Sequence, residues 1–361
     1  MHLLDLPREL LAGLPAHLRN IEDFNNMRST CRTLRAIFEG TLPNTVLRLA
    51  AASAPTFFSP HPHFLVMATA RQVSDWALGH EERTKQLVEA FRGGIDGLYA
   101  LCVEKAGLTL EDVRRLHLAR FSVINPLADK IDKMAGRQWY ATPNFWSGGV
   151  SEPYTIETEA DRAAFQVIIY GELFASTMRA HLEPERNLPR FGRDVRIEFI
   201  KYCIPDWVCE GGYKGFEVLP SGPYRKDREV ERINGDQVAL HHILSSRRWA
   251  RLWEPVMRAV GPDFEDKRCQ AVWWNAVQTQ GLEGMELVTV EHENAEKGEL
   301  PERWTQLLRE MYHRVEALNE DMLPAQADLD GHTAPPPAGN DLPPLFLQEV
   351  FTCCRGMWGH R

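Results

Sequence analysis

Apolar residues recur every three or four positions along most of this chain, and no other feature constrains its fold as strongly. The pattern is clear from Leu10 to Phe38, returns from Phe64 to Phe91, and resumes at Ile95 after the pair Gly93-Gly94. Such spacing places apolar side chains on one face of a helix, which then packs into a core. The sequence therefore predicts a mainly α-helical protein.

Two helix starts are marked by hydroxyl–carboxylate pairs. Thr109 precedes Asp112 by three residues, and Thr158 precedes Asp161 in the same way. In this arrangement the side chains can pair with the unbonded amides of a first helical turn. The second pair predicts a helix from Ala160 to Leu182. Its inward stripe should consist of Phe165, Ile168, Ile169, Leu173, Phe174 and Met178.

Two segments depart from helical spacing and favour strands. Residues 195–199 alternate apolar and charged side chains, and residues 286–291 are rich in β-branched residues. Both patterns are typical of strands. Helices are predicted between them, around Asp236–Val260 and Asp266–Gln280, so we expect a small α+β or α/β portion around residues 190–295.

The first forty residues should form two or three short helices. Pro15 and the polar pair Arg19-Asn20 interrupt the apolar pattern, and proline is tolerated only in a first helical turn. We expect breaks near Pro15 and around Asp23. Short amphipathic helices of this kind can leave apolar side chains for the groove of a partner.

The same residues carry a composite motif. Leu6-Pro7-x-Glu9-Leu10 is followed by Met27-Arg28-x-Thr30-Cys31-Arg32-x-Leu34-Arg35. Together they resemble the F-box of many fungal proteins, over little more than a tenth of the chain. The resemblance implies a substrate receptor that binds a Skp-like adaptor and a cullin ubiquitin ligase, with no catalytic residue of its own. A generic amphipathic helical hairpin is the alternative. The partner-binding residues implied by the resemblance are Leu6, Pro7, Leu10, Leu14, Leu18, Ile21, Phe24, Met27 and Cys31.

Composition shifts suggest four parts. They are an F-box-like module at 1–45, a mostly helical domain at 46–323, a linker at 324–344 that contains six prolines, and an apolar C-terminal helix at 345–361. The C-terminal helix is too apolar to remain exposed to solvent, so we expect it to dock on the body or to bind a partner. No leucine-rich, WD or kelch repeat is visible, so the sequence does not identify a target.

Composition also narrows the class of protein. A net charge of −9 over 361 residues argues against a protein that binds nucleic acid over its whole surface. Seven scattered cysteines favour reduced thiols in the cytosol or nucleus, and no apolar run is long enough for a membrane span. We therefore expect a cytoplasmic or nuclear protein without membrane segments.

An enzyme is the rival hypothesis. The segment Tyr213-Lys-Gly-Phe-Glu217 is loosely similar to a stretch of cyclodipeptide synthases, which join amino acids taken from aminoacyl-tRNAs. That likeness implies a biosynthetic transferase with tRNA as its partner and with Tyr213, Glu217 and Glu172 as catalytic residues. A basic patch could meet the phosphates, although a solvated helix face is the simpler interpretation. The patch comprises Arg225, Lys226, Arg228, Arg232, Arg247, Arg248 and Arg251.

No metal or cofactor is expected. His241-His242 and Glu291-His292-Glu293 lack the spacing of known metal motifs, and adjacent histidines on a helix point about 100° apart. Cys203, Cys209, Cys353 and Cys354 do not follow zinc-site spacing either, so we interpret them as packed thiols. No phosphate-binding or dinucleotide glycine motif occurs.

Overall fold

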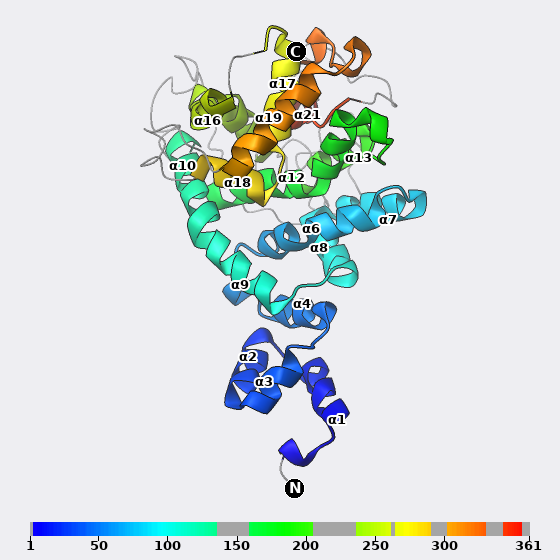
Figure 1. Cartoon of the computed structure of the whole chain (residues 1–361), viewed down its shortest axis with the longest axis vertical. Helices are drawn as coiled ribbons and strands as arrows, with labels where there is room; N and C mark the ends of the chain where they lie inside the picture. The colour runs from blue at the N-terminus through cyan, green and yellow to red at the C-terminus, as the bar shows by residue number, and fades with distance from the viewer. Residues whose placement is uncertain are drawn as a thin grey trace, which may run out of the picture.

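The computed structural model describes residues 3–135, 159–204, 236–260, 264–289, 302–329 and 342–355. Within these ranges all regular structure is helical and no strand occurs, so the predicted helical class is confirmed and the predicted β component is wrong. None of the helices in the described ranges is both long and apolar enough to cross a bilayer. A small group of N-terminal helices projects from a larger helical body (Figure 1).

The projecting group, here called the N-terminal module, covers residues 3–38 (Figure 1). Its elements are η1 (Leu3–Asp5), α1 (Arg8–Gly13), η2 (Leu14–His17), α2 (Ile21–Thr30) and α3 (Arg32–Phe38). The helical path breaks after the η2 turn that contains Pro15, as predicted. The predicted break at Asp23 is wrong: Asn20 accepts a 2.8 Å hydrogen bond from the Asp23 amide and caps α2, and the second break lies at Cys31.

The body follows from residue 43. Its first half comprises α4 (Pro43–Ala52), α5 (Ala54–Phe57), α6 (His63–Ala77), α7 (Glu81–Arg92), α8 (Gly94–Lys105), α9 (Leu110–Ala119), the π-helical turn η3 (Arg120–Ile124) and α10 (Asn125–Ala135). The predicted capping box is confirmed, because Thr109 accepts a hydrogen bond from the Asp112 amide while the Asp112 carboxylate accepts one from the Thr109 amide.

The second half of the body surrounds α12 (Ala160–Leu182), whose bounds match the prediction. All six predicted inward residues of α12 are buried, and α12 packs against α6 and α10. The remaining elements are η4 (Pro184–Arg186), α13 (Arg193–Cys203), α15 (Asp236–Ser245), α16 (Arg247–Val260), α17 (Lys267–Gln278), α18 (Leu282–Thr289), α19 (Glu302–Glu316), η6 (Glu320–Met322), α20 (Gln326–Leu329) and α21 (Phe346–Arg355).

The described residues of both predicted strands are helical, and residues 290–291 lie outside the described ranges. Residues 195–199 lie in α13, where Arg196 is as buried as the apolar residues around it, because it pairs with Glu349 of α21. The alternation of apolar and charged residues in this segment therefore does not correspond to an alternation of buried and exposed side chains. Residues 286–289 lie in α18, whose Leu287, Val288 and Thr289 are all buried, so packing overrides the β-propensity of the last two.

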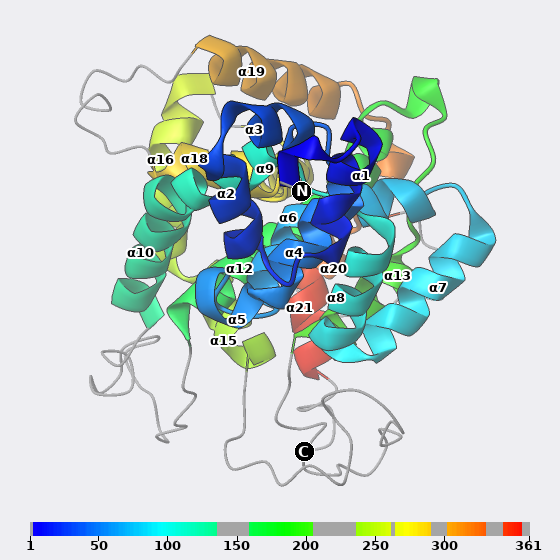
Figure 2. The same cartoon turned by 90° about the horizontal axis from the view of Figure 1, so that it is seen from below.

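The N-terminal module is joined to the body through α4. The Arg48 guanidinium on α4 donates to the carbonyls of Pro15 and Ala16 at 3.3 and 2.9 Å. The apolar residues of both parts form one continuous core. Helix α2 packs against α4, which lies between the module and the rest of the body (Figures 1 and 2). The module is thus held on one end of the body.

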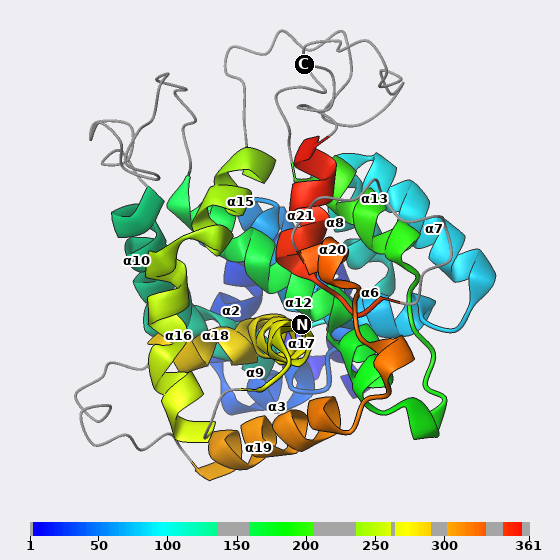
Figure 3. The same ribbon diagram turned by 90° about the horizontal axis from the view of Figure 1, so that it is seen from above.

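Helix α21 lies on the opposite end, beside α15 and α13 (Figure 3). Its residues Leu345, Phe346 and Val350 are buried, so the apolar C-terminal segment packs on α13 and α15. Both ends of the predicted linker are packed as well, since Pro324, Pro343 and Pro344 are buried. Helix α20 lies within the first part of the predicted linker.

Candidate functional site

Helix α1 has apolar side chains on two sides. Leu11 is 3% exposed and belongs to the core, whereas the adjacent Leu10 is 58% exposed. Successive residues of a helix point about 100° apart, so a single helix can bury one leucine and present the next. A soluble helix has no structural need for the exposed leucine, which makes this edge of the module a candidate binding surface.

The module core sets the orientation of α1. Phe24 and Phe38 pack with their ring centroids 5.1 Å apart, and Ile21, Leu34 and Ile37 complete the buried set. Helix α1 lies against α3 and inserts Leu11 into this core. Because Leu11 is anchored there, Leu10 is directed away from it.

The structure divides the predicted partner-binding residues into three groups. Pro7 and Leu10 are exposed. Ile21 and Phe24 are buried in the module core and are not accessible to a partner. The other predicted residues are half-buried and pack against the core; they are Leu6, Leu14, Leu18, Met27 and Cys31.

Sequence reasoning missed two exposed leucines. Leu3 and Leu4, in the η1 turn just before α1, rank among the most exposed large apolar residues of the described ranges. The signal was present as a leucine pair ahead of Leu6-Pro7, outside the motif. We call Leu3, Leu4, Pro7 and Leu10 the apolar edge.

The residues proposed for enzyme chemistry do not form a site in the described part of the chain. Tyr213 and Glu217 lie outside the described residues, as do Arg225, Lys226, Arg228 and Arg232 of the predicted basic patch. Glu172 lies on α12, where one carboxylate oxygen pairs with Arg71 Nε at 2.6 Å and the other accepts from the Leu282 amide at 2.8 Å. Glu172 thereby ties α6 to α12 and caps the start of α18.

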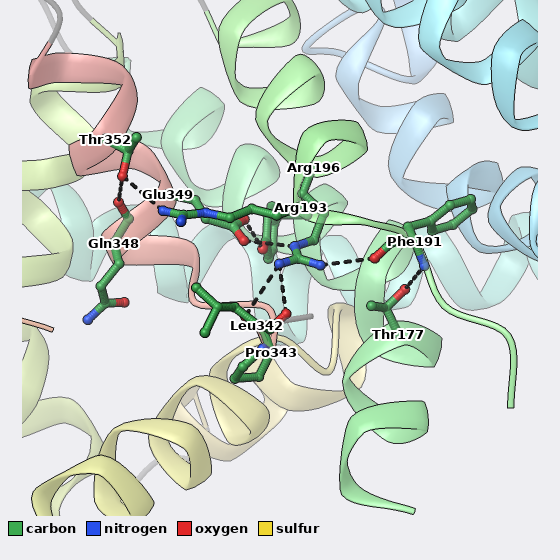
Figure 4. A network of polar contacts seen from close by, with 10 residues as sticks. Thr177, Phe191, Arg193, Arg196, Leu342, Pro343, Gln348, Glu349 and Thr352 are labelled. Atoms are coloured by element: carbon green, nitrogen blue, oxygen red, sulfur yellow. Dashed lines mark hydrogen bonds and ion pairs between the residues drawn. The ribbon is translucent and has the colours of Figure 1, made fainter. Parts of the chain in front are cut away.

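Another carboxylate, which is fully buried, has a similar structural function (Figure 4). Glu349 of α21 pairs with Arg196 Nε at 2.7 Å and accepts from the Tyr170 hydroxyl at 2.5 Å, and all three residues are buried. Arg196 also donates to the carbonyls of Phe191, Leu342 and Pro343. The network therefore fastens α21 to α12 and α13.

The protonation states of Tyr170 and Arg196 support the same conclusion. Burial, aided by the charge of Glu349, holds the pKa of Tyr170 well above its usual value, so the hydroxyl remains a hydrogen-bond donor. Burial opposes the charge of Arg196, but Glu349 outweighs it and the pKa of Arg196 is raised. The arginine and tyrosine stay protonated across the ordinary pH range, as a structural contact requires.

No metal site was found in the part of the chain that the structure describes, where no three His, Cys, Asp or Glu side chains converge. The ring of His241 packs near Phe351, with centroids 4.8 Å apart, and Cys203 and Cys353 are both present as thiols. His292 and its flanking glutamates, and Cys209, lie outside the described residues. Arg247, Arg248 and Arg251 are exposed on α16, as a solvated helix face would be.

Comparison with known proteins provides no further assignment. No family model matches the sequence, no curated protein is significantly similar to it, and no solved structure matches the fold.

Proposed function

We propose that this protein is an F-box-type receptor, in which the N-terminal module binds a Skp-like adaptor through its apolar edge and the helical body holds a protein target for a cullin ubiquitin ligase. The observation that carries the proposal is the pair Leu10 and Leu11, one exposed and one buried on the same short helix. The sequence motif Leu6-Pro7-x-Glu9-Leu10 lies at this edge.

The position of the module supports the proposal. The apolar edge belongs to helices that project from one end of the molecule, so a partner can approach it without displacing the body (Figure 1). Exposed leucines on short helices match the anchors that a partner's apolar groove buries. The rival transferase has no comparable support, since Glu172 is engaged with Arg71 and the Leu282 amide.

The test is a titration of the full chain against a purified Skp-type adaptor by isothermal titration calorimetry. The wild type is expected to bind, and Leu10→Asp should weaken binding by roughly tenfold to a hundredfold, because burying one leucine contributes about 1.5–3 kcal/mol. The double variant Leu6→Ala/Pro7→Ala should also weaken binding.

Leu118→Asp provides the matched control. Leu118, at 65%, is slightly more exposed than Leu10, at 58%, but it lies on α9 of the body, so this variant should bind the adaptor as the wild type does. A wild-type chain that does not bind the adaptor, or a Leu10→Asp variant that binds equally well, would refute the proposal.

A further inference from the structure

A cavity of about 400 Å³ opens between α15, α16, α17 and α21. These helices lie on the end of the body opposite the N-terminal module (Figures 1 and 3). The volume is at the lower end of the range for ligand sites, which suits one bulky side chain or a small molecule better than a large cofactor.

The walls of the cavity are largely apolar. Met257 of α16, Trp274 of α17 and Leu347 of α21 line it, with Leu244 of α15 beside them. Trp274 packs edge-on against Trp253, with ring centroids 5.9 Å apart, and Trp253 is buried. The exposed part of Trp274 is thus held in place, as a preformed anchor site requires.

Two glutamines that line the cavity have buried polar atoms without a partner among the described residues. Gln278 is 8% exposed; its Oε1 accepts from Trp249 Nε1 at 3.3 Å, and its Nε2 has no partner. On α21, Gln348 Oε1 likewise has none. Both atoms have almost no accessible surface, so a ligand in the cavity does not reach them in this conformation, and the apolar walls and the charge at the rim define what the cavity can bind.

The charge of the residues that line the cavity further restricts the class of ligand that fits it. Lys267 is the one charged side chain among the described residues that line it, and no carboxylate lines it. An isolated ammonium at the mouth of an apolar cavity favours a ligand with a carboxylate close to its apolar group.

We infer that this cavity binds a peptide segment of the target protein, in which a bulky apolar side chain enters between Met257, Trp274 and Leu347 and a neighbouring acidic group meets Lys267. The inference rests on the proposed function for one point, that the occupant belongs to a protein target: the helices that line the cavity lie at the end of the molecule opposite the proposed adaptor-binding edge, so both partners can be bound at once (Figure 1).

The test is to pan a random decapeptide library, displayed on phage, against the immobilised full chain. We expect the selected peptides to share an aromatic or large aliphatic residue next to Asp or Glu. Ala250 is exposed and lines the cavity, so Ala250→Trp should fill it and reduce binding of the selected peptides at least tenfold. Ala100→Trp, at an exposed alanine of α8, is the matched control and should bind normally.

A second variant keeps the test valid if Ala250→Trp folds poorly. Lys267→Glu changes only an exposed rim residue and should weaken the same peptides about tenfold. Selected peptides without a shared motif, or with equal affinity for both cavity variants and the wild type, would overturn the inference. Binding of 3-phenylpropionate, with no peptide selected, would assign the cavity to a small carboxylic acid instead.

Adaptor binding, measured with the same proteins, separates this inference from the proposed function. Ala250→Trp and Lys267→Glu should bind the adaptor normally, and Leu10→Asp should bind the selected peptides normally. Peptide binding without adaptor binding would refute the receptor proposal alone. Adaptor binding without peptide selection would refute the cavity assignment alone.

Discussion

The N-terminal module and the helical body use their apolar and charged residues differently. In the module, a small core formed around Phe24 and Phe38 leaves Leu3, Leu4 and Leu10 exposed. In the body, helices distant in sequence are joined by buried ion pairs, such as Arg196 with Glu349, 153 positions apart. The module thus has three exposed leucines grouped beside its small core, whereas the body adds buried charge pairs to its core and exposes apolar residues such as Leu118 and Phe121 on other helical segments.

This difference has a consequence for stability. A body held by buried charges should respond sharply to the loss of one partner, because the remaining charge cannot return to water. A module whose exposed leucines contribute nothing to its own fold should tolerate their loss. All tryptophans of the chain lie beyond residue 75, so tryptophan fluorescence reports on the body and not on the module.

The largest effect is expected from Glu349→Ala. This change leaves the Arg196 guanidinium buried without its counter-charge, and breaking such a pair costs about 3–5 kcal/mol. Urea unfolding followed by tryptophan fluorescence measures the loss. Glu254→Ala is the control, since its pair with Arg258 is exposed and contributes about 0–1 kcal/mol. Equal losses in the two variants would contradict the role assigned to the buried network.

The next largest effect is a loss of stability in acid that originates at His63. Burial first, and then the charge of Arg162, lowers the pKa of His63 from 6.5 to about 3. The folded state therefore binds this proton less readily than the unfolded state. The stabilising contribution is complete above pH 6.5 and decreases as the pH falls towards 3. His63 alone should make the body about 3 kcal/mol less stable at pH 4 than at pH 7.

His63→Leu tests this prediction directly. The ring nitrogens of His63 have no hydrogen-bond partner among the described residues, so an apolar side chain loses no contact of that kind. The variant should lose less stability between pH 7 and pH 4 than the wild type, as measured by urea unfolding at each pH. An unchanged pH dependence would show that another group controls acid unfolding of the body.

Leu11→Ala should have a smaller effect, confined to the module. Truncating a buried leucine costs about 2–5 kcal/mol, and the small module can relax, so we expect about 2 kcal/mol. Hydrogen exchange should accelerate in α2 and α3, while the tryptophan unfolding curve of the body should stay unchanged. Leu10→Ala is the paired control and should change stability by less than about 0.5 kcal/mol. Equal effects of the two changes would mean that α1 does not have distinct buried and exposed faces.

Local sequence patterns predicted much of this fold but not its long-range contacts. The helix Ala160–Leu182 and the capping box at Thr109 were predictable because spacing and cap lie within a few residues. The alternation at residues 195–199 suggested a strand, because nothing near Arg196 indicates that its partner is Glu349. Similarly, α18 begins where Glu172, 110 positions earlier, accepts from the Leu282 amide.

The candidate sites show the same limit. The motif around Leu6 and Pro7 located the module, but which of its leucines are exposed depends on how α1 packs against α3. The cavity lined by Trp274 and Leu347 is formed by residues of four helices, and no spacing within the sequence predicts it.

The smallest effects concern helix capping and can be tested by a reciprocal exchange between the two regions. In the module, the Cys31 thiol caps α3 by accepting from the Leu34 amide at 3.5 Å, a weak contact. In the body, the Thr109 hydroxyl accepts from the Asp112 amide at 3.1 Å within a full capping box. Hydroxyl oxygens cap helices well, so Thr109→Cys should destabilise the body by about 1 kcal/mol, and Cys31→Ser should stabilise the module by about 0.5 kcal/mol. Urea unfolding measures the first change, and hydrogen exchange of α3 measures the second. If Cys31→Ser destabilises the module instead, packing of the half-buried thiol against the core outweighs its role as a cap.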